Sequence, residues 1–145
     1  MRFEIEAVCV SDQKSTQKHA VENILLIKDY GIEKDSHAGP GIRQVSFLAG
    51  EEIDIVRSEG LALEHGAFGE NIVTRGIDLT ITEVGGRLII GETELEITQK
   101  GKECHTPCII QEMAGRCIMP EKSVFARVIK GGIAHDGSSG HYSIR

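Results

Sequence analysis

The chain has 145 residues, four cysteines and a formal net charge of −6. A chain of this length can bury one hydrophobic core, so we expect residues 1–145 to form a single domain. The negative charge argues against a general nucleic-acid-binding protein, whose surface is basic. A local basic pocket for an anionic small molecule stays open, because the charge of one site need not follow the total.

The amino terminus and the hydropathy pattern predict the compartment. Met1 leads into the strand-like alternation of residues 2–6 and not into a signal peptide. No apolar run approaches the roughly 20 residues of a membrane span. We therefore expect a cytoplasmic protein that does not contact membranes, with its cysteines reduced and not paired in disulfides.

The first strand and the loop after it are the first predicted elements. Residues 3–10 alternate as a strand that buries Cys9 in the core. The polar loop at residues 11–18 contains Lys14 and Ser15. This loop is either a solvated turn or an anion-holding loop, because hydroxyls and lysines can both meet a phosphate.

A glycine-rich loop separates the next two predicted strands. Residues 21–30 predict the second strand, and three glycines and a proline shape the loop at residues 31–41. His37 in this loop is either a ligand or phosphate donor, or is hydrogen-bonded within the loop. Residues 43–48 predict the third strand. Arg43 at its start is either an oxyanion clamp or part of a surface salt bridge.

The second half predicts one helix and several short strands. Residues 49–58 show helical spacing and end before Gly60. After the glycine turn at residues 66–69, Glu70 and Asn71 can satisfy backbone groups. The polar tail at residues 135–145 is expected to be flexible. The fold class is therefore mainly all-β, a mixed or antiparallel β-barrel with a few short helices. Further strands are predicted at residues 72–73, 79–84, 87–90, 93–98 and 124–129.

The segment at residues 100–120 carries three of the four cysteines. Thr106 and Pro107 predict the N-cap and first residue of a short helix that stops at Gly115. Cys108 then lies in the first turn, where free N–H groups and the helix dipole lower the pKa of a thiol. We interpret Cys108 as the reactive thiol.

Three alternatives for these cysteines remain open. Cys108 is an inert buried side chain in the first, because free cysteine usually behaves as a small hydrophobe. Zinc is the second, although the spacing of the four candidate ligands lacks a C-x-x-C pair. In the third, Cys104 acts with Cys108 as a resolving pair. The candidate zinc ligands are Cys104, His105, Cys108 and Cys117.

Together these motifs resemble the MOSC domain, which is named after the C-terminal domain of molybdenum cofactor sulfurases. Nearly the whole chain is covered, in the family's order, and the small stand-alone bacterial members are the most similar. Lys34 stands where relatives often have glycine. The matching pieces are residues 11–18, 31–39, 43–46, 69–72, 91, 95–98, the cysteine segment and 125–132.

The resemblance implies a barrel with a cleft for the phosphate-bearing pterin of the molybdenum cofactor, or for a related metal–sulfur species. The cofactor is either held or bound transiently. Cys108 matches the family's functional cysteine, a ligand of molybdenum or a persulfide sulfur carrier, and Cys104 is a second catalytic candidate. A sulfur donor or a cofactor-biosynthesis protein is the implied partner. Residues that match the lining of the anionic site are Lys14, Ser15, His37, Arg43 and Asn71.

Two further activities are compatible with the resemblance. One is a molybdenum-dependent reductase of N-hydroxylated compounds that keeps the cofactor bound and needs a second redox partner. The other is a non-catalytic module that binds and delivers the cofactor. Bound pterin, a persulfide on Cys108 and the metal content of the purified protein distinguish these activities from sulfur transfer.

Overall fold

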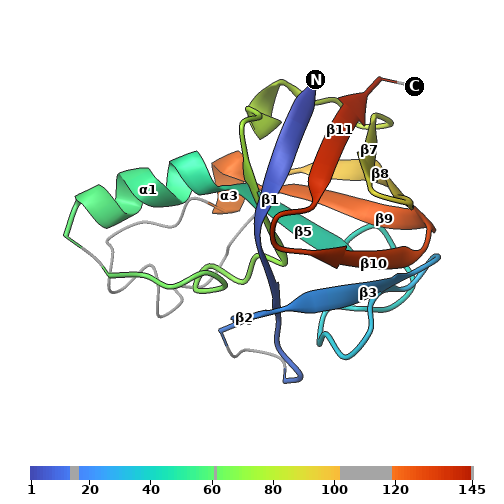
Figure 1. The fold of residues 1–145 in the computed structure, drawn as a ribbon, viewed down its shortest axis with the longest axis horizontal. Coiled ribbons are helices and arrows are strands. Elements are labelled where there is room, and N and C mark those ends of the chain that lie inside the picture. Colours follow the sequence, from blue (N-terminus) through green and yellow to red (C-terminus); the bar gives the residue numbers. More distant parts are fainter. Residues whose placement is uncertain (14–16, 61, 102–118, 145) are drawn as a thin grey trace.

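The computed structural model describes residues 1–13, 17–60, 62–101 and 119–144 (Figure 1). Within these ranges most of the regular structure is strand, as the sequence predicts. The longest helix in these ranges is α1 (Gly50–Ser58), which confirms the helix predicted at residues 49–58. No helix in the described ranges has the length and apolar character needed to span a membrane.

Seven strands form a closed barrel in the order β11-β7-β8-β9-β5-β6-β1, and pairing of β1 with β11 closes the ring. The pair β5–β6 is parallel, and the other neighbouring pairs of the ring are antiparallel. This confirms the predicted mixed barrel, in which closure removes the free edges of a sheet. The strands are β1 (Arg2–Val10), β5 (Val45–Ala49), β6 (Ile72–Arg75), β7 (Arg87–Ile90), β8 (Thr93–Lys100), β9 (Val124–Lys130) and β11 (Ser139–Ser143).

Four short strands lie outside the ring. The predicted strand at residues 21–30 is divided, because the chain changes partner at Glu22. Strand β2 (His19–Val21) pairs with β1, whereas β3 (Asn23–Ile27) pairs with β10 (Gly132–His135) and β4 (Gly31–Ile32). The sheet β10-β3-β4 lies at one end of the barrel (Figure 1).

The alternation of side chains along the strands produces two hydrophobic clusters. One set points into the barrel and includes Phe47, Ile72 and Val124. The opposite set points outward and is covered by α1 and by the loop after it, so that Leu48, Val73 and Phe125 pack with residues of α1. Period-two alternation explains why adjacent residues of one strand belong to different clusters. The outer cluster contains Ala7, Cys9, Leu48, Ile53, Val56, Leu63, Ala67, Phe68, Val73 and Phe125.

The predicted strand at residues 79–84 is wrong. Residues Leu79–Ile81 form a 3-10 turn, η1, instead. Its N-cap Asp78 accepts hydrogen bonds from the backbone N–H of Thr80 at 3.0 Å and from its hydroxyl at 2.6 Å. An aspartate that satisfies the backbone in this way competes with strand pairing, which explains the difference.

The predicted flexible tail at residues 135–145 is also wrong for most of its length. Residues Ser139–Ser143 form β11, which pairs with both β1 and β7. Gly140 fits this position because an added Cβ would lie 2.3 Å from the ring of Phe3. The Tyr142 hydroxyl accepts a hydrogen bond from the backbone N–H of Glu83 at 3.0 Å. This segment, although rich in glycine and serine, therefore forms the last strand of the barrel.

Candidate functional site

The described structure contains three of the seven predicted site residues: His37, Arg43 and Asn71. The other four, Lys14, Ser15, Cys104 and Cys108, lie outside the described residues, as do the remaining candidate zinc ligands. Their predicted roles stay predictions. Within residues 1–13, 17–60, 62–101 and 119–144, no group of three or more His, Cys, Asp or Glu side chains could hold a metal ion.

A row of neighbouring residues crosses the outer face of the barrel. Gln99 on β8 pairs with Phe125 on β9, and Phe125 pairs with Ser46 on β5. The backbone N–H of Asn71 donates to the carbonyl of Ser46 at 3.1 Å, and its carbonyl accepts from Cys9 at 2.7 Å. The row therefore runs over five neighbouring segments of the barrel, from β8 through β9, β5 and the residue before β6 to β1.

Arg43 is held at one end of this row. Its Nε donates to Oε1 of Gln99 at 3.0 Å, and its guanidinium carbon lies 5.5 Å from the ring centroid of Phe125. Arg43 is exposed, and its two terminal NH2 groups have no partner among the residues that the structure describes. A cation fixed at Nε with its terminal N–H groups directed elsewhere can grip an oxyanion. The alternative of a surface salt bridge finds no carboxylate partner in the described part of the chain.

Gln99 connects Arg43 to the start of the cysteine-bearing segment. Its Nε2 donates to the carbonyl of Gly101 at 2.8 Å. The backbone N–H of Gly101 donates to the carbonyl of Ser123, also at 2.8 Å, which ties the end of β8 to the start of β9. Gly101 is the last described residue before the segment that carries Cys104 and Cys108. Arg43 is thus connected through Gln99 to Gly101, the described residue that precedes that segment.

Asn71 lies in the middle of the row and is 1% exposed. Its Oδ1 accepts hydrogen bonds from the backbone N–H and the hydroxyl of Ser46, at 3.0 and 3.2 Å. Its Nδ2 donates to the carbonyl of Cys9 at 3.1 Å. These contacts join β1 to β5 and give Asn71 a structural role. Its predicted contact with a cofactor stays a prediction.

Glu70 precedes Asn71 and closes the turn that covers the row. Its carboxylate accepts from the backbone N–H groups of Gly66 at 2.8 Å and Phe68 at 3.0 Å. Burial raises the pKa of Glu70, and these backbone hydrogen bonds oppose that rise. Glu70 therefore satisfies backbone groups, as the sequence predicts.

His37 belongs to a group at the other end of the row. Its Nδ1 lies 2.7 Å from Nζ of Lys18, which also lies 2.7 Å from Oδ1 of Asp35. Asp35 Oδ2 accepts from the backbone N–H of His37 at 3.2 Å, and Oδ1 accepts from the backbone N–H of Ser11 at 3.0 Å. The side chains of Lys18 and Asp35 are both fully buried, whereas His37 is exposed. Sequence reasoning did not single out this ion pair, because no pattern connects residues 17 positions apart.

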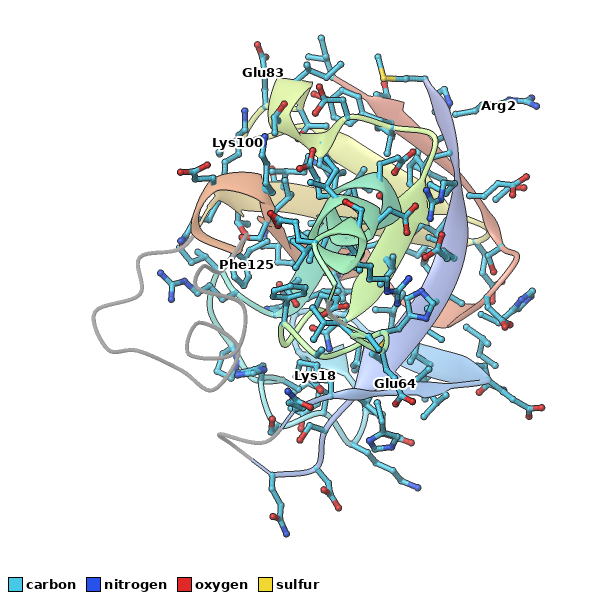
Figure 2. The ribbon with its side chains drawn as sticks, turned by 90° about the vertical axis from the view of Figure 1, so that its left-hand side faces the viewer. Arg2, Lys18, Glu64, Glu83, Lys100 and Phe125 are labelled. Carbon is cyan, nitrogen blue, oxygen red and sulfur yellow. The ribbon has the colours of Figure 1, made fainter. Side chains whose placement is uncertain are left out.

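The two ends of the row share neighbours. Phe125, under Arg43, packs in the same cluster as Cys9. Lys18 directly precedes β2, in which Ala20 pairs with Cys9 and His19 pairs with Val10. Figure 2 shows Phe125 next to α1 and Lys18 below it, both in the view that faces the end of α1. The Arg43 and His37 groups therefore lie along one outer face.

Cys9 is the described cysteine of this face, and it is inert. It is fully buried, and burial together with the nearby charge of Glu70 raises the pKa of its thiol to about 12. A thiol in that state is not a nucleophile near neutral pH. This confirms its prediction as a core residue.

Two surface cavities are found elsewhere in the described structure. The first, of about 330 Å³, lies between the start of α1, η1 and Lys122. The second, of about 620 Å³, lies over Arg87, Glu94 and Glu96. Neither is lined by His37, Arg43 or Asn71, and the residues of the second are held by ion pairs such as Arg87–Glu94 at 2.8 Å.

The comparisons with known proteins decide the family. The model of the MOSC domain matches residues 33–142, which include His37, Arg43, Asn71, Gln99 and Phe125. The chain belongs to the MOSC domain family. No match was found among curated protein sequences.

Solved structures share the fold of this MOSC domain. The crystal structure of the YuaD protein from Bacillus subtilis has a TM-score of 0.81 and 18% identity, with 98% of this chain and 96% of that chain covered. YiiM from Escherichia coli has a TM-score of 0.70 and 19% identity, covering 100% of this chain and 71% of the other. YiiM from Geobacillus stearothermophilus has a TM-score of 0.71 and 15% identity, covering 97% and 75%. At these identities the likeness concerns the fold.

Proposed function

We propose that this MOSC domain binds the phosphate-bearing pterin of the molybdenum cofactor, or a related metal–sulfur species, on the face that carries Arg43 and His37. Membership of a family associated with the molybdenum cofactor supports the ligand class. The observation that carries the proposal is the arrangement of Arg43. Its Nε donates to Gln99 and its guanidinium lies over the ring of Phe125, while its terminal NH2 groups have no partner in the described residues.

The residues of this face fit a phosphate group. A guanidinium offers two parallel N–H donors to two oxygens of a phosphate, and a histidine adds a directional donor. Arg43 and His37 are exposed and accessible to a ligand, whereas the row between them is packed under α1 and the loop after it. When bound, the cofactor supplies a molybdenum centre that accepts sulfur ligands. Arg43 and His37 would hold its phosphate, and Cys108 would provide the soft thiolate contact that such a metal prefers.

Cys108 has a second proposed use as a sulfur carrier. Its thiolate attacks the terminal sulfur of a donor persulfide, the S–S bond of the donor breaks, and the donor leaves as a thiolate. Cys108 then carries the sulfur as a persulfide. This step requires a sulfur-donor protein, which is the proposed partner. Cys9 does not compete for the sulfur, because its thiol is buried with a pKa of about 12.

Thiol reactivity and mass analysis test the cysteine. The protein is incubated with a persulfide donor, and the modified cysteine is located by peptide mass analysis. We expect a gain of one sulfur on Cys108 that Cys108→Ala abolishes and Cys117→Ala, a matched change in the same segment, retains. Bound pterin with an unreactive Cys108 would overturn sulfur transfer and support the delivery module.

A further inference from the structure

The contact between Lys18 and His37 bears on which ring nitrogen of His37 carries the proton. Lys18 Nζ lies 2.7 Å from His37 Nδ1 and 2.7 Å from Asp35 Oδ1. The Lys18 and Asp35 side chains have no exposed surface, so the ammonium is paired with a carboxylate away from water. An ammonium group has three donors and no acceptor. The atom that faces it on His37 must therefore accept.

We propose that Lys18 is a positioning residue that holds His37 in the neutral tautomer with its proton on Nε2. A neutral imidazole has one donor nitrogen and one acceptor nitrogen, and the hydrogen bond of one nitrogen sets the state of the other. Because Nδ1 accepts from Lys18, Nε2 carries the proton. His37 is then a neutral hydrogen-bond donor, and not a general base or a ligand that offers a lone pair at Nε2.

Asp35 completes this arrangement by fixing both partners of the contact. Its Oδ1 accepts from Lys18, and its Oδ2 accepts from the backbone N–H of His37 at 3.2 Å. The backbone N–H of Ser11 also donates to Oδ1, at 3.0 Å. One buried carboxylate therefore aligns the ammonium, the backbone of His37 and the end of β1. The ring of His37 has a defined direction although the residue itself is exposed.

The consequence for ligand binding rests on the proposed function. A neutral Nε2–H donor at the opposite end of the row from the Arg43 cation suits an oxygen of an anionic ligand, since both groups donate. It does not suit direct coordination of a metal by His37, which would require the proton on Nε2 to be displaced. The structure thus assigns His37 to the phosphate and leaves the soft metal contact to a thiolate.

The tautomer is measured in the unmodified protein by long-range 1H–15N NMR correlation at neutral pH, with His37→Gln used to assign the ring signals. We expect an unprotonated Nδ1, a protonated Nε2 and no averaging between tautomers. A protected Lys18 ammonium signal with a cross-peak to the His37 ring is expected as well. A proton on Nδ1, or averaged ring signals, would overturn the proposal.

Two variants of Lys18 separate its donor role from its charge. Lys18→Met removes the donor, whereas Lys18→Gln keeps N–H donors on a side chain that is one atom shorter; both remove the charge beside Asp35. We expect tautomer averaging in the Met variant and the native ring pattern in the Gln variant. Identical ring spectra for the two variants would contradict the proposal. If neither variant folds, the spectrum of the unmodified protein decides.

Inorganic phosphate is the probe that separates this inference from the proposed function. Titration followed by NMR should give weaker phosphate binding for Lys18→Met than for Lys18→Gln, by up to about fivefold, the size of one hydrogen bond, because part of the His37 population then lacks the Nε2 proton. Equal affinities with different ring spectra would support the tautomer and overturn the phosphate contact of His37. A native tautomer pattern in Lys18→Met would overturn the positioning role of Lys18, whatever the affinity for phosphate.

Discussion

Gln99 accepts a hydrogen bond from Arg43 at 3.0 Å although the two residues are 56 positions apart in the sequence. The same Gln99 side chain donates to the carbonyl of Gly101, so one amide joins the candidate anion clamp to the end of β8. Arg43 therefore keeps a defined direction on an exposed surface. The ring of Phe125 below the guanidinium supports that direction.

Removing this support should weaken phosphate binding without changing the charge of the site. In Gln99→Leu, Arg43 keeps its cation but loses the acceptor that fixes Nε. We expect about fivefold weaker binding of inorganic phosphate, measured by calorimetry, as one hydrogen bond is lost. The exposed Asn23→Leu, on β3 outside the ring, is the control and should bind as the unmodified protein does. Unchanged affinity in Gln99→Leu would show that the orientation of Arg43 is unimportant.

Asn71 allows a direct choice between a structural and a ligand role. Asn71→Ala leaves the backbone groups of Ser46 and Cys9 without their side-chain partner in a buried place. We expect a loss of about 2–4 kcal/mol in the free energy of unfolding, measured by urea denaturation. The exposed Asn23→Ala should change stability little. Full stability with loss of cofactor would instead make Asn71 a ligand.

Lys34 adopts a backbone conformation that favours glycine, with φ of 68°. Glycine enters this left-handed region without the steric cost of a Cβ. We expect Lys34→Gly to raise the free energy of unfolding by about 0.5–1 kcal/mol. Lys28→Gly, in a nearby turn outside the left-handed region, should not stabilise the protein. A destabilised Lys34→Gly would indicate that the lysine side chain makes a contribution of its own.

Glu6 should make stability depend on pH in the acidic range. Burial raises the pKa of Glu6, but hydrogen bonds from His65 and Arg75 outweigh this effect, so the pKa is lowered from 4.5. Because the folded-state pKa is the lower one, the stabilisation is present above pH 4.5 and is lost as the pH falls through the folded-state value. Thermal unfolding of Glu6→Gln should therefore be less pH-dependent in this window than that of Glu4→Gln. Equal pH profiles would rule out the contribution of Glu6.

The last strand can be tested at Gly140. Gly140→Ala places a Cβ 2.3 Å from the buried ring of Phe3, so one of the two elements must move. We expect a loss of about 1–3 kcal/mol, as for overpacking in a core, measured by thermal unfolding. Ser139→Ala, at the exposed neighbouring position, should be nearly neutral. A neutral Gly140→Ala would mean that β11 does not close the barrel.

The sequence predicted the fold where local pattern and tertiary pairing agree. The hairpin of β7 and β8 and the helix α1 were found from alternation and helical spacing. Residues 79–84 were misread, because the cap by Asp78 is a local contact that competes with a strand pattern. Strand β11 was missed, because its burial depends on contacts with distant segments. Gly140 packs against Phe3, and Tyr142 accepts a hydrogen bond from Glu83.

The residue types of the candidate site could be predicted from the sequence, but the residues that hydrogen-bond to them could not. Arg43 and His37 stood out as a cation and a polar residue in or beside a shaped loop, and the structure places both along one outer face of the barrel. Gln99 and Lys18, which hold them, carry no local signal because their contacts join distant segments. Asn71 was noticed for its type, but its hydrogen bonds to β1 and β5 appear only when the barrel is assembled.

Molybdenum and pterin content per chain is the most direct test of the proposed cofactor site. The unmodified protein, Arg43→Gln and Cys108→Ala are purified from a host that makes the cofactor, with Cys117→Ala as the matched control. We predict bound pterin in the unmodified protein and in Cys117→Ala, and at least tenfold less in folded Arg43→Gln, because a charge-assisted contact worth about 1.5–3 kcal/mol is lost. Molybdenum should fall in Cys108→Ala. Pterin and molybdenum that are absent from the unmodified protein, or that are equal in all four proteins, would contradict the account.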